Sequence, residues 1–364
     1  MQKKIISLIV FFVFLFPLLK GKAQEIKTTY YDEDQTVVKE KYETKAGIPH
    51  GDYRRYHENG PMILSGQFIN GEKQGLFVEY FLGTQDTAKI TPFKDDIKSG
   101  PVTSFHPNGK IAQKANYENA VITGRVDSYF ESGNLKSQTQ FANNNPNGSH
   151  LVYFESGGKR EASTLVDGIL DGVQRTYFEN GALASEKPYK NGLMDGNVLN
   201  YYFSEQLASE VSYKQGVKHG KFITYYENGQ IETEGKYRRG QPHGYFTSYF
   251  EDGVQSELAH FNKGAPEEEM ILYYPSGKIK SKTIYDKYGS KKSFQSYYEN
   301  GALLKESDYH FGQEHGQTTL YFMNGSVQEI IPYKSGLPEG NYQKFSEDGT
   351  LLEERIYKNG KLIE

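Results

Sequence analysis

The stretch HGKFITYYENGQIETEGKYRRGQPHGYFTSYFEDG, residues 219–253, contains nearly the same pattern twice. HGKFITYYENG at residues 219–229 is followed, 24 residues later, by HGYFTSYFEDG at residues 243–253. A pattern that recurs at a fixed step of about 20 to 50 residues is the sequence signature of a repeat architecture. The repeat therefore decides the fold, and the question is how far it extends.

One aromatic position recurs along almost the whole chain. We take the first tyrosine of TYYENG, Tyr225, as the anchor of its repeat. All the anchors are Tyr56, Tyr80, Phe105, Tyr129, Tyr153, Tyr177, Tyr201, Tyr225, Tyr249, Tyr273, Tyr297, Tyr321 and Phe345. Each step is 24 residues, except the 25 residues between Tyr80 and Phe105. The chain thus contains thirteen repeats in phase.

Glycines and a second aromatic residue divide each repeat into two halves. The second aromatic lies 12 residues after the anchor, as in Tyr237, although Leu165 takes this place in the fifth repeat. Glycines lie five residues before the anchor, as in Gly220, and four after it, as in Gly229, each in eleven of thirteen repeats. The exceptions are Glu268 and Lys292 at the first position and Thr84 and Glu205 at the second. A third glycine closes the second half, as in Gly240.

The segments between these glycines are typical of β-strands joined by tight turns. GKFITYYE and QIETEGKYR alternate roughly and are rich in β-branched and aromatic residues. Asn-Gly between two such segments favours a hairpin with a type I′ turn, because this turn requires positive φ. The sequence therefore predicts an all-β fold, an elongated antiparallel meander of about thirteen tandem 24-residue β-hairpin repeats with about 26 strands.

A ladder of aromatic rings is expected to hold the hairpins together. Equivalent rings two strands apart would lie about 9.6 Å from each other. A two-residue turn at Asn228–Gly229 would place Phe222 and Tyr237 on one face and Tyr225 on the other. A bulged three-residue turn would shift one strand and change that assignment. The sequence leaves this choice open.

Composition supports a thin protein with much surface per residue. The 364 residues include 30 Tyr, 22 Phe and 38 Gly, but only 36% are hydrophobic. This is too aromatic for a disordered chain and too poor in aliphatic residues for a large α/β core. There is no cysteine, so neither disulfides nor lipid attachment through cysteine is expected.

Residues 1–23 resemble a signal peptide. MQKK is basic, IISLIVFFVFLFPLL is apolar, and Gly21 and Ala23 precede a suitable cleavage site before Gln24. The alternative is a membrane anchor, but 15 apolar residues are short for a span of about 20. We therefore expect export to the periplasm, cell surface or medium after cleavage near Ala23. The remaining residues carry 38 basic and 46 acidic side chains, a charge of −8 that opposes nucleic acid and anionic lipid.

The recurring residues resemble the MORN repeat in its bacterial variant form, which carries YxxNG and HG signatures. Here these are the stretch from Tyr225 to Gly229 and the pair His219–Gly220, among others, and the resemblance covers roughly residues 30–364. It implies an array of β-hairpins that serves as a binding scaffold. Lipid contact has been proposed for some members, and many bacterial members carry an antitoxin label.

The expected domain organisation follows from the array and its departures. Residues 1–23 form the signal peptide, residues 24–47 a capping region with a degenerate repeat (TTYYDEDQTVVKEKY), and residues 48–364 the tandem array. PEEEM at residues 266–270 and YGSKKS at residues 288–293 replace the glycine five residues before the anchor, and we interpret them as a bend or a bare site.

No motif in the sequence indicates catalysis. His50, His219, His243 and His315 precede the repeat glycine, where we interpret them as polar turn residues that bond to local backbone. The acidic residues recur at turns in most repeats, whereas a catalytic pair occurs once, in a pocket. Nucleophile elbow, P-loop and calcium-loop patterns are absent. The sequence predicts no enzyme, no cofactor, and no catalytic or metal residue, and it singles out no binding residue.

Four functions remain as hypotheses. The first is an exported, non-enzymatic scaffold that binds a protein partner through a long β-sheet surface. The second is a carbohydrate or cell-wall binder that uses the aromatic ladder. Lipid association is the third, and the negative charge opposes it. The fourth is an antitoxin that neutralises a partner, which the apolar leader disfavours. Nucleic acid is not expected as a partner, because its single-stranded form requires a basic groove beside the rings.

Overall fold

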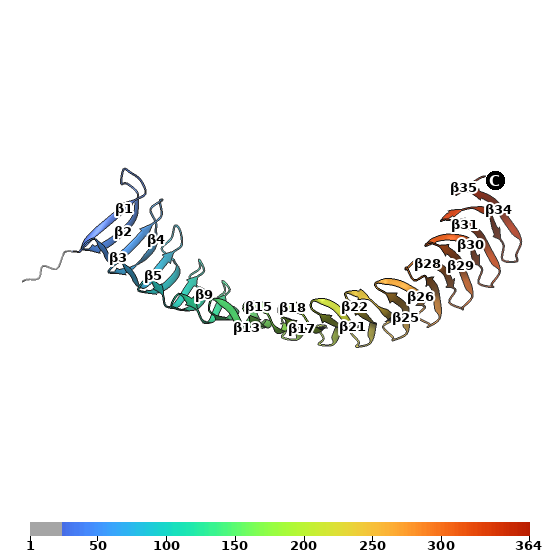
Figure 1. The fold of residues 1–364 in the computed structure, drawn as a ribbon, viewed down its shortest axis with the longest axis horizontal. Coiled ribbons are helices and arrows are strands. Elements are labelled where there is room, and N and C mark those ends of the chain that lie inside the picture. Colours follow the sequence, from blue (N-terminus) through green and yellow to red (C-terminus); the bar gives the residue numbers. More distant parts are fainter. Residues whose placement is uncertain (1–23) are drawn as a thin grey trace, which may run out of the picture. The chain divides into compact units, whose positions relative to one another are not determined.

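The computed structural model describes residues 24–364, and within this range the chain consists of strands and turns, with no helix (Figure 1). These residues form 35 strands, and every recorded pairing is antiparallel in an open meander. The all-β repeat fold expected from the sequence is thereby confirmed. Contacts divide the chain into an N-terminal unit that ends at Gly133 and a C-terminal unit, Asn134–Glu364, and each is described by itself.

The N-terminal unit begins with the two strands contributed by the expected capping region. Its strands are β1 (Glu25–Tyr30), β2 (Val38–Lys45), β3 (Ile48–Tyr56), β4 (Met62–Ile69), β5 (Glu72–Tyr80), β6 (Thr87–Lys94), β7 (Ile97–Lys98), β8 (Gly100–Phe105), β9 (Ile111–Glu118), β10 (Val121–Ile122) and β11 (Gly124–Tyr129). β1 pairs with β2, and β2 in turn pairs with β3 of the first full repeat.

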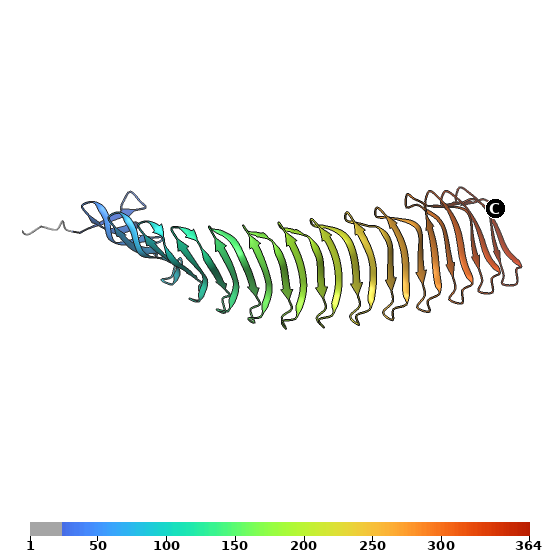
Figure 2. The ribbon, with the colours of Figure 1, turned by 60° about the horizontal axis from the view of Figure 1, so that its bottom comes forward.

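The C-terminal unit is a row of hairpins that lie side by side (Figure 2). Its strands are β12 (Leu135–Ala142), β13 (Asn145–Tyr153), β14 (Lys159–Val166), β15 (Ile169–Leu170), β16 (Gly172–Tyr177), β17 (Leu183–Lys190), β18 (Leu193–Met194), β19 (Gly196–Tyr201), β20 (Leu207–Lys214), β21 (Val217–Tyr225), β22 (Ile231–Arg238), β23 (Gln241–Pro242), β24 (Gly244–Tyr249), β25 (Gln255–Asn262), β26 (Ala265–Tyr273), β27 (Ile279–Tyr285), β28 (Lys291–Tyr297), β29 (Leu303–His310), β30 (Gln313–Tyr321), β31 (Val327–Lys334), β32 (Leu337–Pro338), β33 (Gly340–Phe345), β34 (Leu351–Lys358) and β35 (Lys361–Leu362).

The strand number exceeds the expected 26 for two reasons. The thirteen repeats supply 26 strands of normal length, and β1 and β2 add two more in the described range. The other seven are two-residue strands, most of which arise because a bulge interrupts the first strand of a repeat. β23 and β24, for example, are separated by His243 alone.

The turn at Asn228–Gly229 has three residues and is bulged, which corrects the expected type I′ geometry. The Gly229 N–H donates to the Tyr226 carbonyl at 2.9 Å, and the Tyr226 N–H donates to the Gln230 carbonyl at 2.8 Å. Gly229 has φ of +86°, whereas Asn228 is not left-handed. This is a type I turn followed by a G1 bulge, in which only the last residue needs positive φ.

The type I′ turns lie at the opposite end of the hairpins, where one repeat passes into the next. Arg239 and Gly240 have φ of +54° and +81°, and the flanking pair is Arg238 with Gln241. Asn191 and Gly192 form the same turn with φ of +50° and +78°. Asn-Gly therefore occurs in both kinds of turn, so the dipeptide alone does not distinguish them.

The glycine five residues before the anchor makes a wide bulge. Between β20 and β21, Val211 pairs with Phe222 and Tyr213 pairs with Lys218. Ser212 alone therefore lies opposite three residues, 219–221. Gly220 lies in this bulge with φ of +106°, and a Cβ there would lie 3.1 Å from the Ser212 Cβ. Glycine is required both for the backbone angle and for the close approach of the neighbouring strand.

The pairing beyond the bulged turn settles which residues share a face, because a register shift between Thr224 and Tyr225 restores the pairing that a two-residue turn at Asn228–Gly229 would give. Phe222 pairs with Gly235, and the rings of Phe222 and Tyr237 pack 5.4 Å apart on this face, which we call the core face. The rings of Tyr237 and Phe246 continue the row into the next hairpin at 5.6 Å. The ladder is therefore built from residues three before and twelve after the anchors, and the equivalent rings of Phe222 and Phe246 lie 6.0 Å apart, closer than the expected spacing of about 9.6 Å. The anchors lie on the opposite face, the open face, where Tyr249 bonds to Glu234.

The core face is closed by pairing large rings with small residues. A Cβ at Gly235 would lie 2.5 Å from the Phe246 ring, and Gly66 has the same relation to Phe77 at 2.6 Å. Phe77 is 2% exposed, and Ala259, at the position equivalent to Gly235, is 1% exposed. A single sheet layer thus buries its core by close approach of successive hairpins rather than with a second layer.

The two repeats without the bulge glycine differ from each other. Glu268 keeps the bulge and adopts the left-handed conformation itself, with φ of +64°. In the repeat with Lys292, the turn that leads into the repeat changes instead. Its Asp286 N–H donates to the Ser290 carbonyl, which is the hydrogen bond of a three-residue bulged turn rather than of a type I′ turn. β27 and β28 then pair from Ile284–Ser293 onward without a wide bulge. The PEEEM segment therefore keeps the wide bulge of the other repeats. The YGSKKS segment instead has a bulged turn in place of the type I′ turn and no wide bulge.

Candidate binding surface

Where a tyrosine follows the anchor, its hydroxyl joins that hairpin to the next. The Tyr226 hydroxyl donates to the carbonyl of Tyr249, the next anchor, at 2.7 Å. Tyr202 bonds in the same way to Tyr225 at 2.6 Å. The same bond recurs at Tyr31, Tyr274 and Tyr298. This recurring side chain is thus committed to the contact between repeats.

The asparagine of the bulged turn makes a second connection. The Asn228 Oδ1 accepts from the Gln230 N–H in its own turn at 2.9 Å. Its Nδ2 donates to the Glu251 carbonyl in the next turn, also at 2.9 Å. Asn108 makes the equivalent pair of bonds in the N-terminal unit. The Asn of YENG therefore shapes one turn and binds the following one.

Residues before the bulge glycine connect the other edge. The His219 Nδ1 accepts from the Arg239 N–H at 3.5 Å, and His50 and His315 accept from equivalent backbone N–H groups, each at 3.3 Å. Asp171 serves the same purpose, accepting from Asn191 at 3.0 Å. The interpretation of His50, His219 and His315 as residues that bond to backbone is confirmed, with the difference that the backbone lies in the turn leading to the next repeat. Within residues 24–364, the His243 side chain makes no such bond.

The open face carries the side chains that are not needed for these connections. They lie two and four residues before the anchor and nine and eleven after it, together with the anchor tyrosine. The Tyr249 hydroxyl donates to Glu234 at 2.8 Å, and Tyr153 donates to Gln138 at 3.0 Å. Burial, and then the hydrogen bond to Glu234, raise the pKa of Tyr249. The identity of the other side chains changes from repeat to repeat.

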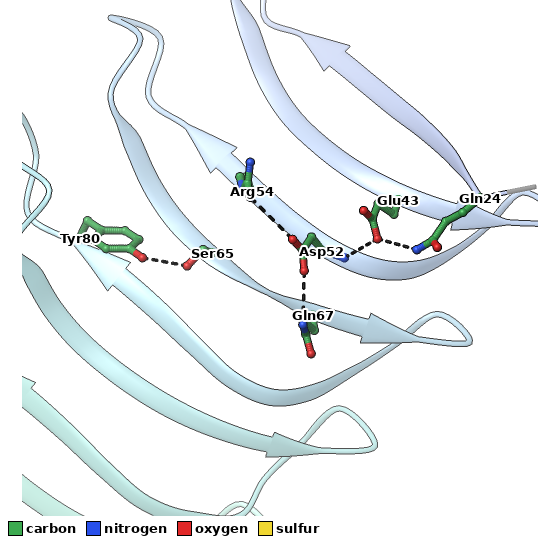
Figure 3. Close-up of polar contacts among 7 residues, drawn as sticks. All are labelled: Gln24, Glu43, Asp52, Arg54, Ser65, Gln67 and Tyr80. Carbon is green, nitrogen blue, oxygen red and sulfur yellow. Dashed lines mark hydrogen bonds and ion pairs between the residues drawn. The ribbon is translucent and has the colours of Figure 1, made fainter.

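In the N-terminal unit these positions line a groove of about 800 Å³ (Figure 3). Asp52 is at its centre, 3.6 Å from Arg54, and it accepts from Gln67 at 3.3 Å. The hydroxyls of Tyr80 and Ser65 lie 3.0 Å apart at one side. The groove therefore offers an aromatic ring beside planar polar groups.

Two further grooves lie on the open face of the C-terminal unit. The larger, about 680 Å³, is lined by Lys221, Ile223, Glu234, Gly235, Lys236, His243, Gly244, Tyr245 and Thr247. The smaller, about 420 Å³, lies between Gln295 and Glu306. Lys221 is anchored by Glu210 at 2.6 Å, which raises the pKa of the lysine. Each groove is thus lined by a different set of charged and aromatic groups.

The sequence singled out none of these residues, because they do not recur. A two-residue turn at Asn228–Gly229 would give the same pairing of Phe222 with Gly235, but the sequence left open whether a bulge shifts the second strand. Within residues 24–364, no group of three or more His, Asp or Glu side chains could hold a metal ion. The same part of the chain contains no helix long and apolar enough to cross a membrane. Residues 1–23, the predicted signal peptide, lie outside the described residues.

Comparisons with solved structures give only weak likenesses. The TcdB2-TccC3 crystal structure is 14% identical over 94% of this chain and 20% of its own, with a TM-score of 0.17. The Photorhabdus luminescens Tc holotoxin pore is 13% identical over 90% of this chain and 23% of its own, with a TM-score of 0.15. The chain thus spans about a fifth of those chains, and TM-scores this low support no argument about function. No curated protein matches the sequence.

A family model does match the repeats that the structure displays. The model described as MORN repeat variant matches residues 98–119, 122–143, 170–191, 194–215, 218–239, 269–287, 293–310 and 338–359. The unmatched hairpins around Tyr56, Tyr80, Tyr153, Tyr249 and Tyr321 have the same strand pairing in the structure. With eight matches in the phase of the structural repeat, the chain belongs to the MORN repeat variant family.

Proposed function

We propose that the chain is an exported, non-enzymatic scaffold that binds a protein partner through the open face of its sheet. One observation carries the proposal. The recurring Tyr, Asn and His side chains connect successive hairpins, whereas the grooves are lined by side chains that differ between repeats. Variable side chains on a constant backbone are the arrangement by which repeat proteins recognise partners.

The charge of the open face suits a protein partner with mixed polarity. The groove beside Tyr245 places Lys236 and Glu234 within one lining, so it presents both signs of charge next to an aromatic ring. Aromatic residues in partly enclosed positions are the usual centres of protein interfaces. Charged groups at the margin act mainly on partner choice and association rate.

Site-specific photocrosslinking tests this proposal. A benzophenone amino acid at Thr247 would lie on the open face in the 680 Å³ groove, and one at the adjacent Ser248 would lie on the core face. We expect a defined crosslinked partner from Thr247 and from Gln295, and none from Ser248. Crosslinks that form only from Ser248, or from neither face in the native compartment, would contradict the proposal.

Export is tested separately, by N-terminal sequencing of the protein isolated from its native cells. The proposal requires a chain that begins at Gln24 and is found outside the cytoplasm. Recovery of a cytoplasmic chain that still begins at Met1 would show that residues 1–23 are not a cleaved leader.

Carbohydrate binding is a second candidate, favoured by the groove of the N-terminal unit. Tyr56 and Tyr80 line this groove together with the planar polar groups of Asp52, Arg54 and Gln67. Titration with soluble cell-wall fragments should quench tyrosine fluorescence, and Tyr80→Ala should remove the response. Tyr273→Ala, an anchor of the other unit, is the control. An unchanged signal across wall polymers would rule out this candidate.

A further inference from the structure

One repeat of the C-terminal unit has a glutamate where most repeats have a glycine with positive φ. At Gly196 a Cβ would lie 2.9 Å from Pro188, and at Gly220 it would lie 3.1 Å from Ser212. Glu268 occupies the equivalent position with φ of +64°. The residue on the preceding strand is here His260, which lies opposite the bulge between the pairs Ala259–Met270 and Phe261–Pro266.

The glutamate side chain meets an exposed aromatic ring. The His260 and Tyr245 rings pack with centroids 4.7 Å apart, from paired positions on β24 and β25. The Glu268 Oε2 lies 3.5 Å from the Tyr245 hydroxyl and 3.7 Å from the His260 Nδ1. Tyr245 remains 53% exposed and the Glu268 side chain 61% exposed. A carboxylate and a ring thus face solvent together on the open face.

Within residues 24–364, the chain supplies neither the carboxylate nor the ring with a lysine or arginine partner. The neighbouring Glu269 pairs with Lys282 at 2.8 Å, but among residues 24–364 no lysine or arginine pairs with Glu268. The His260 Nδ1 is buried and has no hydrogen-bond partner there. Elsewhere the chain places cations over its rings, as Lys218 does over Tyr237 at 4.9 Å. Tyr245 has no such cation in the described structure.

We propose that Tyr245, His260 and Glu268 form a site for a basic side chain, arginine above all, of the protein partner. The guanidinium would stack on the exposed face of Tyr245 and donate to the Glu268 carboxylate, since a planar cation satisfies a ring and a carboxylate at once. His260 supports the ring from behind. The adjoining 680 Å³ groove gives room for the segment that carries the arginine. This inference rests on the proposed function, and it names the chemistry of the partner.

The test uses the full chain labelled with 3-fluorotyrosine, with the Tyr245 resonance assigned through Tyr245→Phe. Titration with N-acetyl-arginine amide should shift this resonance in a saturable way, and the neutral isostere N-acetyl-citrulline amide should not. Glu268→Gly, which restores the common residue of the repeat, should weaken arginine binding about twofold to fivefold. Glu205→Gly is the matched control, because it makes the same change at another left-handed position and should leave binding unchanged.

Three outcomes would overturn the site. They are no shift with arginine, an equal shift with citrulline, and arginine binding that survives Glu268→Gly. A shift with N-acetylglucosamine that Glu268→Gly leaves intact would assign the ring to a glycan instead. Failure here is separate from failure of the scaffold function, because crosslinking from Gln295 reports on a different groove.

Discussion

Single glycines act in this protein through two separable effects, backbone angle and space. Gly229 and Gly240 have positive φ, whereas Gly235 has an ordinary strand conformation and is required because the Phe246 ring occupies the place of its Cβ. The equivalent pair in the N-terminal unit is Ala115 and Val126, both buried. Small and large residues are therefore matched across neighbouring hairpins, as a close-packed core requires.

Gly235→Ala should destabilise its hairpin by about 1–3 kcal/mol, because the new Cβ overpacks the core face. Phe246→Val in the same chain should recover much of this loss, since it copies the Ala115 and Val126 pair. Chemical unfolding followed by hydrogen exchange of β22 and β24 measures both. If the single variant is as stable as the parent, the close approach is not a constraint on the fold.

Glu205 tests the effect of backbone angle alone. It has φ of +67° in a bulged turn where most repeats have glycine. Glu205→Gly should stabilise the C-terminal unit by about 1 kcal/mol, because a non-glycine residue in this region costs roughly that amount. The shift of the urea midpoint measures the gain. Gly229→Ala, at the same turn position of the next repeat, should show a loss of similar size.

At the scale of the hairpin, tyrosine hydroxyls couple one repeat to the next. Tyr226→Phe removes the donor to the Tyr249 carbonyl and should cost about 0.5–1.5 kcal/mol. Tyr177→Phe is the control, because its hydroxyl makes no hydrogen bond within residues 24–364. Hydrogen exchange should accelerate on both sides of the altered contact. Equal effects of the two substitutions would show that ring packing, rather than the bond, couples the hairpins.

The elements also show what the sequence could and could not predict. The spacing of Tyr225 and its equivalents predicted the hairpins and their number, since a fixed step directly reports a structural unit. It did not predict the turn at Asn228–Gly229, because Asn-Gly suits both a type I′ turn and a G1 bulge. Phe222 and Tyr237 share a face as a two-residue turn would have it, because a register shift between Thr224 and Tyr225 compensates for the bulged turn. The sequence does not show this compensation, so the open-face grooves could not be located. Glu268 appeared as a departure, but only its φ and the strand pairing in the structure show that the bulge persists.

For the C-terminal unit as a whole, alkaline pH should be the destabilising condition. Burial raises the pKa of several of its tyrosines above the usual value near 10, namely Tyr201, Tyr249, Tyr273, Tyr285, Tyr309, Tyr321 and Tyr333. The folded state then holds protons that the unfolded state has released. The contribution is fully present below about pH 10 and is lost as the pH rises through the folded pKa values.

Urea unfolding of residues 134–364 at pH 8 and pH 11 measures this dependence. The midpoint should fall at the higher pH, and tyrosinate absorbance should rise with unfolding rather than before it. A constant midpoint would mean that the rings ionise freely in the folded sheet. Because each hairpin contacts mainly its neighbours, the transition need not be two-state, and the midpoint is the safer quantity.

The tyrosine, asparagine and histidine bonds between hairpins connect residues 23, 23 and 20 positions apart. The first two bonds therefore start in one repeat and end in the following one, and the third ends in the turn that leads into the following repeat. Because the other partner in each bond is a backbone group that every repeat supplies, gain or loss of a block of 24 codons would leave each such side chain with an equivalent partner. Ancestral chains of this kind could lengthen or shorten by unequal recombination while remaining folded, and the grooves could diversify afterwards, one block at a time.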